Sequence, residues 1–189
     1  MNFAHRVPST FTNAEFERLV RSGGFGRARV ELRRGMIVKI NPQYVPHAKA
    51  KRLLTKAIEA GLLTAALSWT VDQEVSVVFA DAFSPLPDIV VWDPAAAPAD
   101  LDGPVPASAV RLIVEVADSS LSDDLGEKLE DYATAGLSEY WVADVRGRQI
   151  LQHSGPGNGT YARREPARFG EIIASRTYPE LRVDTAALA

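Results

Sequence analysis

The sequence predicts a single α/β domain in which helices flank a mixed β-sheet. Apolar residues make up 46% of the 189-residue chain and charged residues 24%, which is typical of a globular protein with one hydrophobic core. Segments of strand and helix character follow one another in the order α-β-β-α-β-β-β-α-β-β. Because no repeat or linker interrupts this order, we expect an N-terminal extension over residues 1–11 and one domain over residues 12–188.

The N-terminal part of the chain predicts a short helix and then a β-hairpin. Thr12 and Glu15 have the spacing of a capping box, and they open a helix that should stop at the glycines at 23–24. Residues 29–40, RVELRRGMIVKI, resemble a hairpin with its turn at Arg34-Gly35.

The middle of the chain predicts a second helix and the interior strands. In residues 47–63 apolar side chains recur at helical spacing, with lysines on the opposite side. Residues 69–79 are expected to form one long strand, and residues 85–92, PLPDIVVW, a strand introduced by two prolines. A Pro/Ala-rich loop over residues 94–108 follows. Residues 110–116, VRLIVEV, form a near-continuous branched apolar run that predicts a buried strand.

The C-terminal part predicts a third helix and further strands. Ser122 could cap a helix over residues 123–137, whose first turn carries acidic residues and whose end contains a glycine. Residues 139–145 and 148–154 are expected to form a strand pair, and short strands should follow the turn in GPGNGTY.

Composition excludes several classes of site and places the protein by default in the cytoplasm. The chain has no cysteine, so disulfides, thiolate metal sites and a cysteine nucleophile are excluded. No apolar run approaches the roughly 20 residues needed to cross a bilayer, and the first ten residues lack the order of a signal peptide. Serine-hydrolase, zinc-protease, Walker and dinucleotide fingerprints are absent from the sequence.

Charge is distributed unevenly along the chain, although the net charge is only −3. Residues 1–56 have a balance of +9, and the remaining residues a balance of −12. This asymmetry suits a surface that faces a polyanion beside an acidic cation site. A basic face that is merely solvated explains the N-terminal excess equally well.

Three charged residues need a joint explanation. Glu115 lies inside the apolar run LIVEV, where an isolated ionised carboxylate is prohibitively costly to bury. Asp88 begins another apolar strand, and Lys128 lies on the predicted helix that follows Glu115. If the strands of Asp88 and Glu115 are neighbours, roughly 4.8 Å apart, the two carboxylates can converge on one ion. Two carboxylates, water and phosphate oxygens are a common way to hold Mg²⁺, and an ammonium group can assist the attacking water.

These residues resemble a known superfamily of nucleases. The dipeptides at 87–88 and 115–116 resemble the PD-(D/E)XK pattern, in which a lysine usually follows two places after the glutamate; that position here is Ala117. Residues 115–144, together with the hairpin sequence VELRRGMIVKINP, closely resemble the Uma2 family (formerly DUF820), a bacterial branch with the restriction-endonuclease-like fold. The resemblance covers roughly residues 12–188. In that branch the lysine lies on the following helix, where this chain has Lys128.

The resemblance implies a role for each matched residue. Asp88 and Glu115 would be metal ligands, with the Val116 carbonyl as a third, and Lys128 would be the catalytic lysine. Glu31 matches a position that brings another carboxylate to the cleft. Phosphate contacts are expected on the basic helix, from a histidine that matches the family and from two cations near it: His47, Lys49 and Arg52.

Each of these residues also has a purely structural interpretation. Asp124 lies four residues before Lys128, the favourable orientation for an ion pair on a helix. Asp88 could be a turn residue at a strand start, and Glu31 could be solvated on its hairpin. The acidic residues of the third helix are expected to form mainly a solvated face: Asp123, Asp124, Glu127, Glu130 and Asp131. Three aromatic residues are expected to pack in the core rather than to stack on bases: Tyr132, Tyr140 and Trp141.

Three functions remain open from the sequence. The leading one is an endonuclease that hydrolyses DNA phosphodiester bonds with Mg²⁺ or Mn²⁺, for which a homodimer would allow both strands to be cut. The second is a catalytically inactive module of the same fold that binds nucleic acid or a protein. The third is a small dimeric scaffold with no nucleic-acid role.

Overall fold

The computed structural model describes residues 9–80 and 82–189, so the first eight residues of the expected N-terminal extension lie outside the described part. Within that part, six strands form a mixed sheet in the order β10-β9-β8-β7-β5-β3. Its strands are β3 (Thr70–Gln73), β5 (Ile89–Trp92), β7 (Val110–Ala117), β8 (Glu139–Asp144), β9 (Gln149–Gly157) and β10 (Thr160–Arg168). Strands β7 and β8 run parallel and the other neighbours antiparallel, which confirms the predicted mixed sheet.

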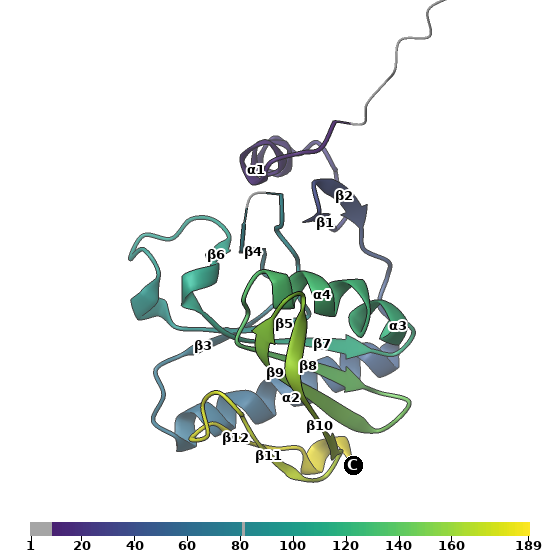
Figure 1. Ribbon diagram of the computed structural model, residues 1–189, viewed down its shortest axis with the longest axis vertical. Helices are drawn as coiled ribbons and strands as arrows, with labels where there is room; N and C mark the ends of the chain where they lie inside the picture. Colours follow the sequence, from purple (N-terminus) through teal and green to yellow (C-terminus); the bar gives the residue numbers. More distant parts are fainter. Residues whose placement is uncertain (1–8, 81) are drawn as a thin grey trace, which may run out of the picture.

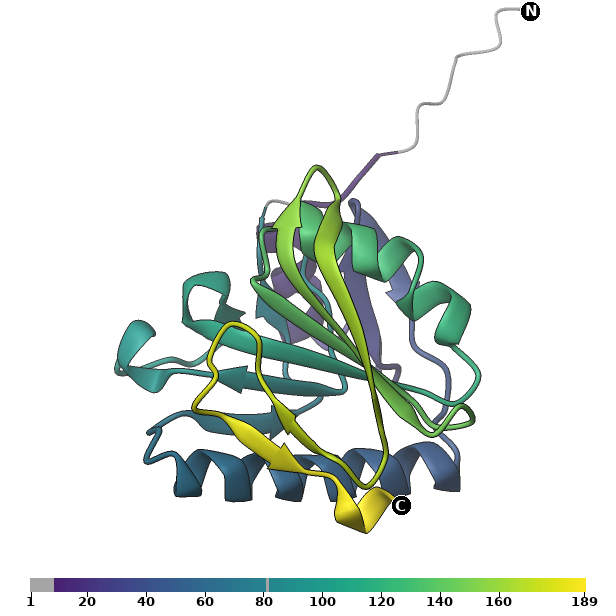
Figure 2. The ribbon, with the colours of Figure 1, turned by 60° about the horizontal axis from the view of Figure 1, so that its bottom comes forward.

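Helices cover both faces of this sheet, as Figure 2 shows. Helix α2 (Val45–Thr64) lies along one face, and the short helices α3 (Leu121–Asp124) and α4 (Glu127–Thr134) lie along the other. An apolar cluster lies on each face of the sheet, and successive side chains of β7 contribute to one and then the other. Leu112 and Val114 pack toward α2, while Ile113 packs with the aromatic residues of α4 and β8. Glu115 has the same parity as Ile113 and therefore faces α4.

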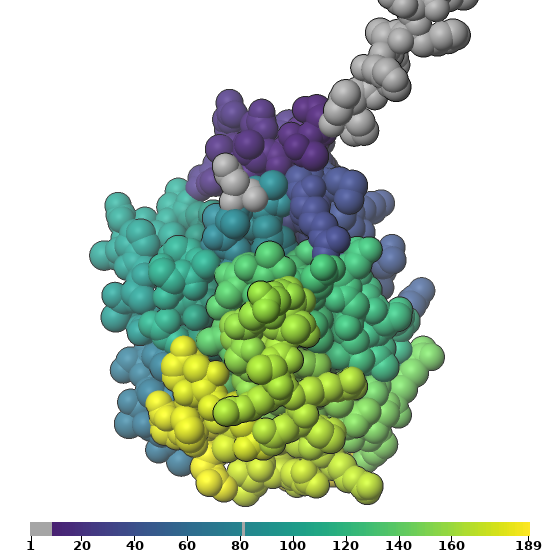
Figure 3. Space-filling model, in the orientation of Figure 1, coloured from purple at the N-terminus to yellow at the C-terminus, as the bar shows by residue number. Residues whose placement is uncertain are grey.

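Smaller elements surround the central sheet (Figure 1). Helix α1 (Asn13–Arg21) lies near a hairpin of β1 (Val30–Arg33) and β2 (Met36–Lys39) at one end of the molecule. Paired short strands complete the margins: β4 (Val77–Val78) with β6 (Val105–Pro106), and β11 (Ile172–Ala174) with β12 (Arg182–Asp184). Single 3-10 turns are η1 (Pro94–Ala96), η2 (Ala107–Ala109) and η3 (Ala186–Leu188). The hairpin β9–β10 and the C-terminal segment cover the lower part of the face in Figure 3.

The predicted cap and hairpin turn near the N-terminus are confirmed. The Thr12 side chain accepts from the Glu15 N–H, and the Glu15 carboxylate accepts from the Thr12 N–H at 2.9 Å. The β1–β2 turn has positive φ at Arg34 (51°) and Gly35 (75°). A Cβ atom at Gly35 would lie 2.5 Å from the Cβ of Thr10, so the turn requires glycine there.

Four other predictions about elements are wrong. The long strand expected over residues 69–79 is divided, because Glu74 adopts a φ of 58° and ends β3. The helix expected over residues 123–137 is also divided: Gly126, with φ −105° and ψ −108°, separates α3 from α4. Its cap position is Ser120 rather than Ser122. The strand after the GPGNGTY turn, β10, is not short but spans nine residues.

No helix within residues 9–80 and 82–189 is both long and apolar enough to cross a bilayer.

Candidate active site

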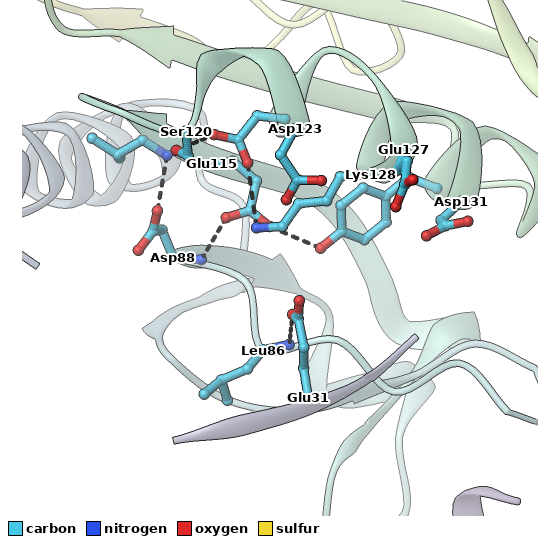
Figure 4. Close-up of polar contacts among 12 residues, drawn as sticks. Glu31, Leu86, Asp88, Glu115, Ser120, Asp123, Glu127, Lys128 and Asp131 are labelled. Atoms are coloured by element: carbon cyan, nitrogen blue, oxygen red, sulfur yellow. Dashed lines mark hydrogen bonds and ion pairs between the residues drawn. The ribbon is translucent and has the colours of Figure 1, made fainter. Parts of the chain in front are cut away.

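Asp88 and Glu115 are brought together by two adjacent strands. Asp88 directly precedes β5, and the register pairs Ile89 with Val114, so Asp88 lies beside Glu115. The main chain ties the two residues to each other. The Asp88 N–H lies 3.3 Å from Glu115 Oε2, to which it donates, and the Val116 N–H donates to Asp88 Oδ2 at 2.9 Å. Pairing of the strands and these two hydrogen bonds therefore hold both carboxylates next to each other, as Figure 4 shows.

Both carboxylates line a cleft of about 390 Å³ between the β1–β2 hairpin, the start of α2 and the α3–α4 segment. We call this space the acidic cleft. Its walls include five of the residues predicted for the site: Glu31, His47, Asp88, Glu115 and Lys128. Two predicted phosphate contacts, Lys49 and Arg52, are exposed on α2 but do not line the cleft.

Asp88 is held by polar side chains at the start of α2. His47 Nε2 lies 2.9 Å from Asp88 Oδ2, Gln43 Nε2 donates to Oδ1 at 2.7 Å, and Lys51 Nζ is 3.5 Å from Oδ1. Burial alone would raise the pKa of Asp88. The hydrogen bond and charge of His47, the Val116 N–H and the charge of Lys51 outweigh burial and hold this pKa below its ordinary value.

Lys51 is a site residue that the sequence interpretation missed. It is buried, and besides Asp88 it contacts Gln43 Oε1 at 2.6 Å and the carboxylate of Glu74. The available signal was its spacing, since Lys51 lies four residues after His47 and so on the same side of α2. The amphipathic pattern of this helix predicts instead that its lysines are exposed to solvent.

Glu115 is 2% exposed and meets two donors from α4. Lys128 Nζ lies 3.2 Å from Glu115 Oε1, and the Tyr132 hydroxyl donates to the same oxygen at 3.0 Å. Burial raises the pKa of Glu115 to about 8; Lys128 opposes this rise, and the nearby carboxylates of Asp88, Asp124 and Glu31 add to it.

Lys128 bridges two buried carboxylates. Its Nζ is 3.2 Å from Glu115 and 3.3 Å from Asp124, so the ion pair expected within the helix and the approach to the cleft occur together. Burial would lower the pKa of Lys128, but Glu115 and Asp124 more than compensate and raise it above its ordinary value. Ala117, at the position where the superfamily usually has its lysine, is buried in the core. The ammonium group reaches Glu115 from α4 instead.

Glu31 approaches the same cleft from the hairpin. It is buried rather than solvated, and its Oε2 lies 3.3 Å from the Leu86 N–H. Figure 4 shows its carboxylate directed from β1 toward the space where Lys128 and Glu115 meet.

The expected solvated acidic face of α3 and α4 is confirmed for Glu127 and Glu130, which are exposed, and is wrong for two of the five residues. Asp124 and Asp131 are buried. Arg33 of β1 lies against Asp123, Glu127 and Asp131, and none of these ion pairs was predicted. The expected core packing is confirmed for Tyr132, Tyr140 and Trp141, which are fully buried.

The donor set of the cleft fits a hard divalent cation. Carboxylate oxygens are the ligands that Mg²⁺ prefers, and the crowding of carboxylates around Glu115 is a repulsion that a cation would relieve. Within the part of the chain that the structure describes, His47 Nδ1, in a residue that lines the cleft, is buried without a hydrogen-bond partner, and Asp124 Oδ1 meets the ammonium of Lys128 at 3.3 Å. Throughout residues 9–80 and 82–189, no group of three or more Asp, Glu, His or Cys side chains is arranged to hold a metal. An ion here would therefore depend on two carboxylates, water and substrate oxygens.

Comparison with known proteins agrees with this architecture. Residues 14–186 match the Uma2 family, whose description is "Putative restriction endonuclease". A crystal structure described as "a putative nuclease belonging to DUF820", from Anabaena variabilis ATCC 29413, superposes with a TM-score of 0.60 at 15% sequence identity. The superposition covers 84% of this chain and 88% of that chain, which shows that the restriction-endonuclease-like fold is shared. No curated protein matches the sequence. By the match across nearly its whole length, the chain belongs to the Uma2 family.

Proposed function

We propose that this protein is an endonuclease that hydrolyses DNA phosphodiester bonds with the aid of Mg²⁺ or Mn²⁺. The observation that carries the proposal is the convergence of Asp88 and Glu115 from adjacent strands on one cleft, with Lys128 Nζ 3.2 Å from Glu115. Membership of a family of nucleases supports a substrate that contains phosphodiester bonds.

Asp88 and Glu115 would hold the cation through their carboxylates. Bound there, a divalent cation would polarise the phosphodiester and lower the pKa of a coordinated water. The Val116 carbonyl stays a predicted third ligand; its N–H already orients Asp88. Lys128 would hold the attacking water and offset negative charge that develops on the phosphate. Glu31 would act as a further carboxylate that orders water in the cleft.

Substrate phosphates would meet cations along the walls of the cleft. Arg29 and Lys39 line it beside His47, and together they would bind the DNA backbone without reading its sequence. Lys49 and Arg52 would extend this contact along the exposed side of α2 when the duplex passes the cleft. Such binding should weaken steeply as salt concentration rises.

Lys128→Met is expected to reduce Mg²⁺-dependent nicking of supercoiled DNA by about 10²-fold, because it removes the ammonium group that would stabilise charge in the transition state. Binding of the same DNA, measured by fluorescence anisotropy, should change little, since only 17% of the Lys128 side chain is exposed. Lys56→Met, a change at an exposed lysine of α2, is the matched control. Nicking by Lys128→Met within a few-fold of the unaltered protein would remove the proposed role.

Divalent-cation binding is expected to tighten as pH rises and to level off above pH 8. Burial, with the neighbouring carboxylates, raises the pKa of Glu115 to about 8, so below that pH the carboxyl must release a proton when a cation binds. The apparent Kd for Mn²⁺ should fall about tenfold per pH unit between about pH 6 and pH 8. Calorimetry of Mn²⁺ binding in buffers of different ionisation enthalpy measures both the Kd and the released proton. A Kd that does not change with pH would contradict this role of Glu115.

The competing function is an inactive module of the same fold that binds nucleic acid or a protein. One observation favours it: the oxygens of Asp88 and Glu115 already have partners within the chain, so neither carboxylate needs an ion. An inactive module would bind DNA but cleave none with any divalent cation, whatever residue is present at position 128. Residence in the cytoplasm and a homodimer stay predictions.

A further inference from the structure

We propose that Arg33 is a positioning residue. By forming ion pairs with carboxylates on one side of α3 and α4, it holds Lys128 beside Glu115. The inference rests on the proposed function, because Arg33 would act on the reaction only through Lys128.

The contacts of Glu115 come from one row of side chains on the helices. Asp124, Lys128 and Tyr132 are spaced four residues apart and share one side of the α3–α4 segment. Lys128 and Tyr132 contact Glu115 directly, and Asp124 pairs with Lys128. A small rotation of α4 would therefore displace the ammonium group and the hydroxyl together.

Arg33 contacts the adjacent row, one residue earlier in each turn. Its Nη1 lies 3.2 and 3.1 Å from the two carboxylate oxygens of Asp123, its Nη2 is 3.5 Å from Glu127, and its Nε is 3.3 Å from Asp131. The planar guanidinium thus meets three successive turns at fixed angles, which a flexible ammonium cannot do. Figure 4 shows Glu127 and Asp131 on α4 with Lys128, and Asp123 on α3.

The ion pairs of Arg33 connect the two helices across the break between them. Gly126 separates α3 from α4, so hydrogen bonds of a continuous helix do not fix the rotation of one relative to the other. Arg33 contacts Asp123 before the break, and Glu127 and Asp131 after it. The ion pairs therefore supply an alignment that the helix backbone does not provide.

The main chain next to Arg33 is fixed by hydrogen bonds and burial. The preceding residue, Leu32, is fully buried, and it exchanges two main-chain hydrogen bonds of 2.9 Å with Ser84. Arg33 is also buried, so its side chain has little freedom to leave the carboxylates. Its neighbour Arg34 contacts Glu130 and Asp131 from outside and is half-exposed, which makes it a matched control.

The test compares Arg33→Lys with Arg34→Lys in the full chain. Arg33→Lys keeps the charge and removes the planar guanidinium. We expect kcat for Mg²⁺-dependent nicking to fall about 10-fold to 100-fold with KM for DNA unchanged, and Arg34→Lys to retain both values. The second readout does not require activity: brief acylation of lysines, quantified by peptide mass spectrometry. Lys128 should label several-fold faster in Arg33→Lys, while the buried Lys51 on α2 stays protected as it is in the unaltered protein.

The outcomes separate this inference from the proposed function. If Lys128 is labelled faster and Lys51 is not, the positioning role of Arg33 is supported, whether or not the protein nicks DNA. If the protein also nicks no DNA, the proposed function fails while the positioning role of Arg33 is retained. Unchanged labelling of Lys128 overturns the inference. Equal acceleration at Lys128 and Lys51 also overturns it, because Arg33 would then stabilise the whole domain rather than position one helix. A loss of kcat that Arg34→Lys reproduces overturns it as well.

Discussion

Replacing Glu115 by glutamine is expected to lower Mg²⁺-dependent nicking by at least about 10³-fold while the protein stays folded. The amide keeps the shape of the side chain but cannot supply a negative charge to a divalent cation. Glu130→Gln, on the exposed side of α4, is the matched control and should retain activity. Nicking of supercoiled DNA over a range of Mg²⁺ concentrations measures the loss. Substantial cleavage by a purified Glu115→Gln protein would refute the assignment of this residue.

The same variant should gain stability relative to the unaltered protein as pH rises. The pKa of Glu115 is raised from an ordinary 4.5 to about 8, so between these values the unfolded chain releases a proton that the folded protein retains. This carboxyl therefore costs the fold nothing below pH 4.5, and its unfavourable contribution grows until about pH 8. Glutamine does not titrate, so the difference in melting temperature should favour the variant increasingly over that window. A difference independent of pH would show that Glu115 is ionised throughout.

Glu139→Ala is expected to have the largest effect on stability, lowering the free energy of unfolding by about 3 kcal/mol or more. Glu139 is fully buried on β8 and accepts four hydrogen bonds: from Trp141 Nε1 at 2.6 Å, Ser175 Oγ at 2.6 Å, Arg176 N at 3.0 Å and Thr177 N at 2.8 Å. Alanine would leave these donors without an acceptor and free the segment between β11 and β12 from the sheet.

Urea unfolding with linear extrapolation measures the effect of Glu139→Ala. Glu59→Ala, a change at an exposed glutamate of α2, is the control and should alter stability by less than about 0.5 kcal/mol. A similar small value for Glu139→Ala would mean that water replaces the carboxylate at little cost.

The core of the site could be predicted because its signals are local. Apolar runs on both sides of Glu115 and after Asp88 identify interior strands, and alternation along a strand determines which face Glu115 meets. The hairpin turn at Gly35 could be predicted for the same reason, since few residues other than glycine tolerate its φ of 75°.

The supporting residues could not be predicted, because their roles depend on partners far away in the chain. Arg33 pairs with side chains 90 to 98 residues later, and nothing in a charged hairpin distinguishes a buried arginine from a solvated one. Lys51 carries the charge pattern of an exposed helix position, although Asp88 and Glu74 enclose it. The break at Gly126 was missed because helical periodicity continues across it, from Asp124 to Lys128.

Anomalous scattering from Mn²⁺ soaked into crystals of the protein tests most directly the claim that Asp88 and Glu115 together bind a divalent cation. At a pH above 8, we expect one strong peak in the acidic cleft, about 2.0–2.3 Å from an oxygen of each carboxylate. A peak held by neither residue, or no peak at a concentration of Mn²⁺ that supports nicking, would contradict the account.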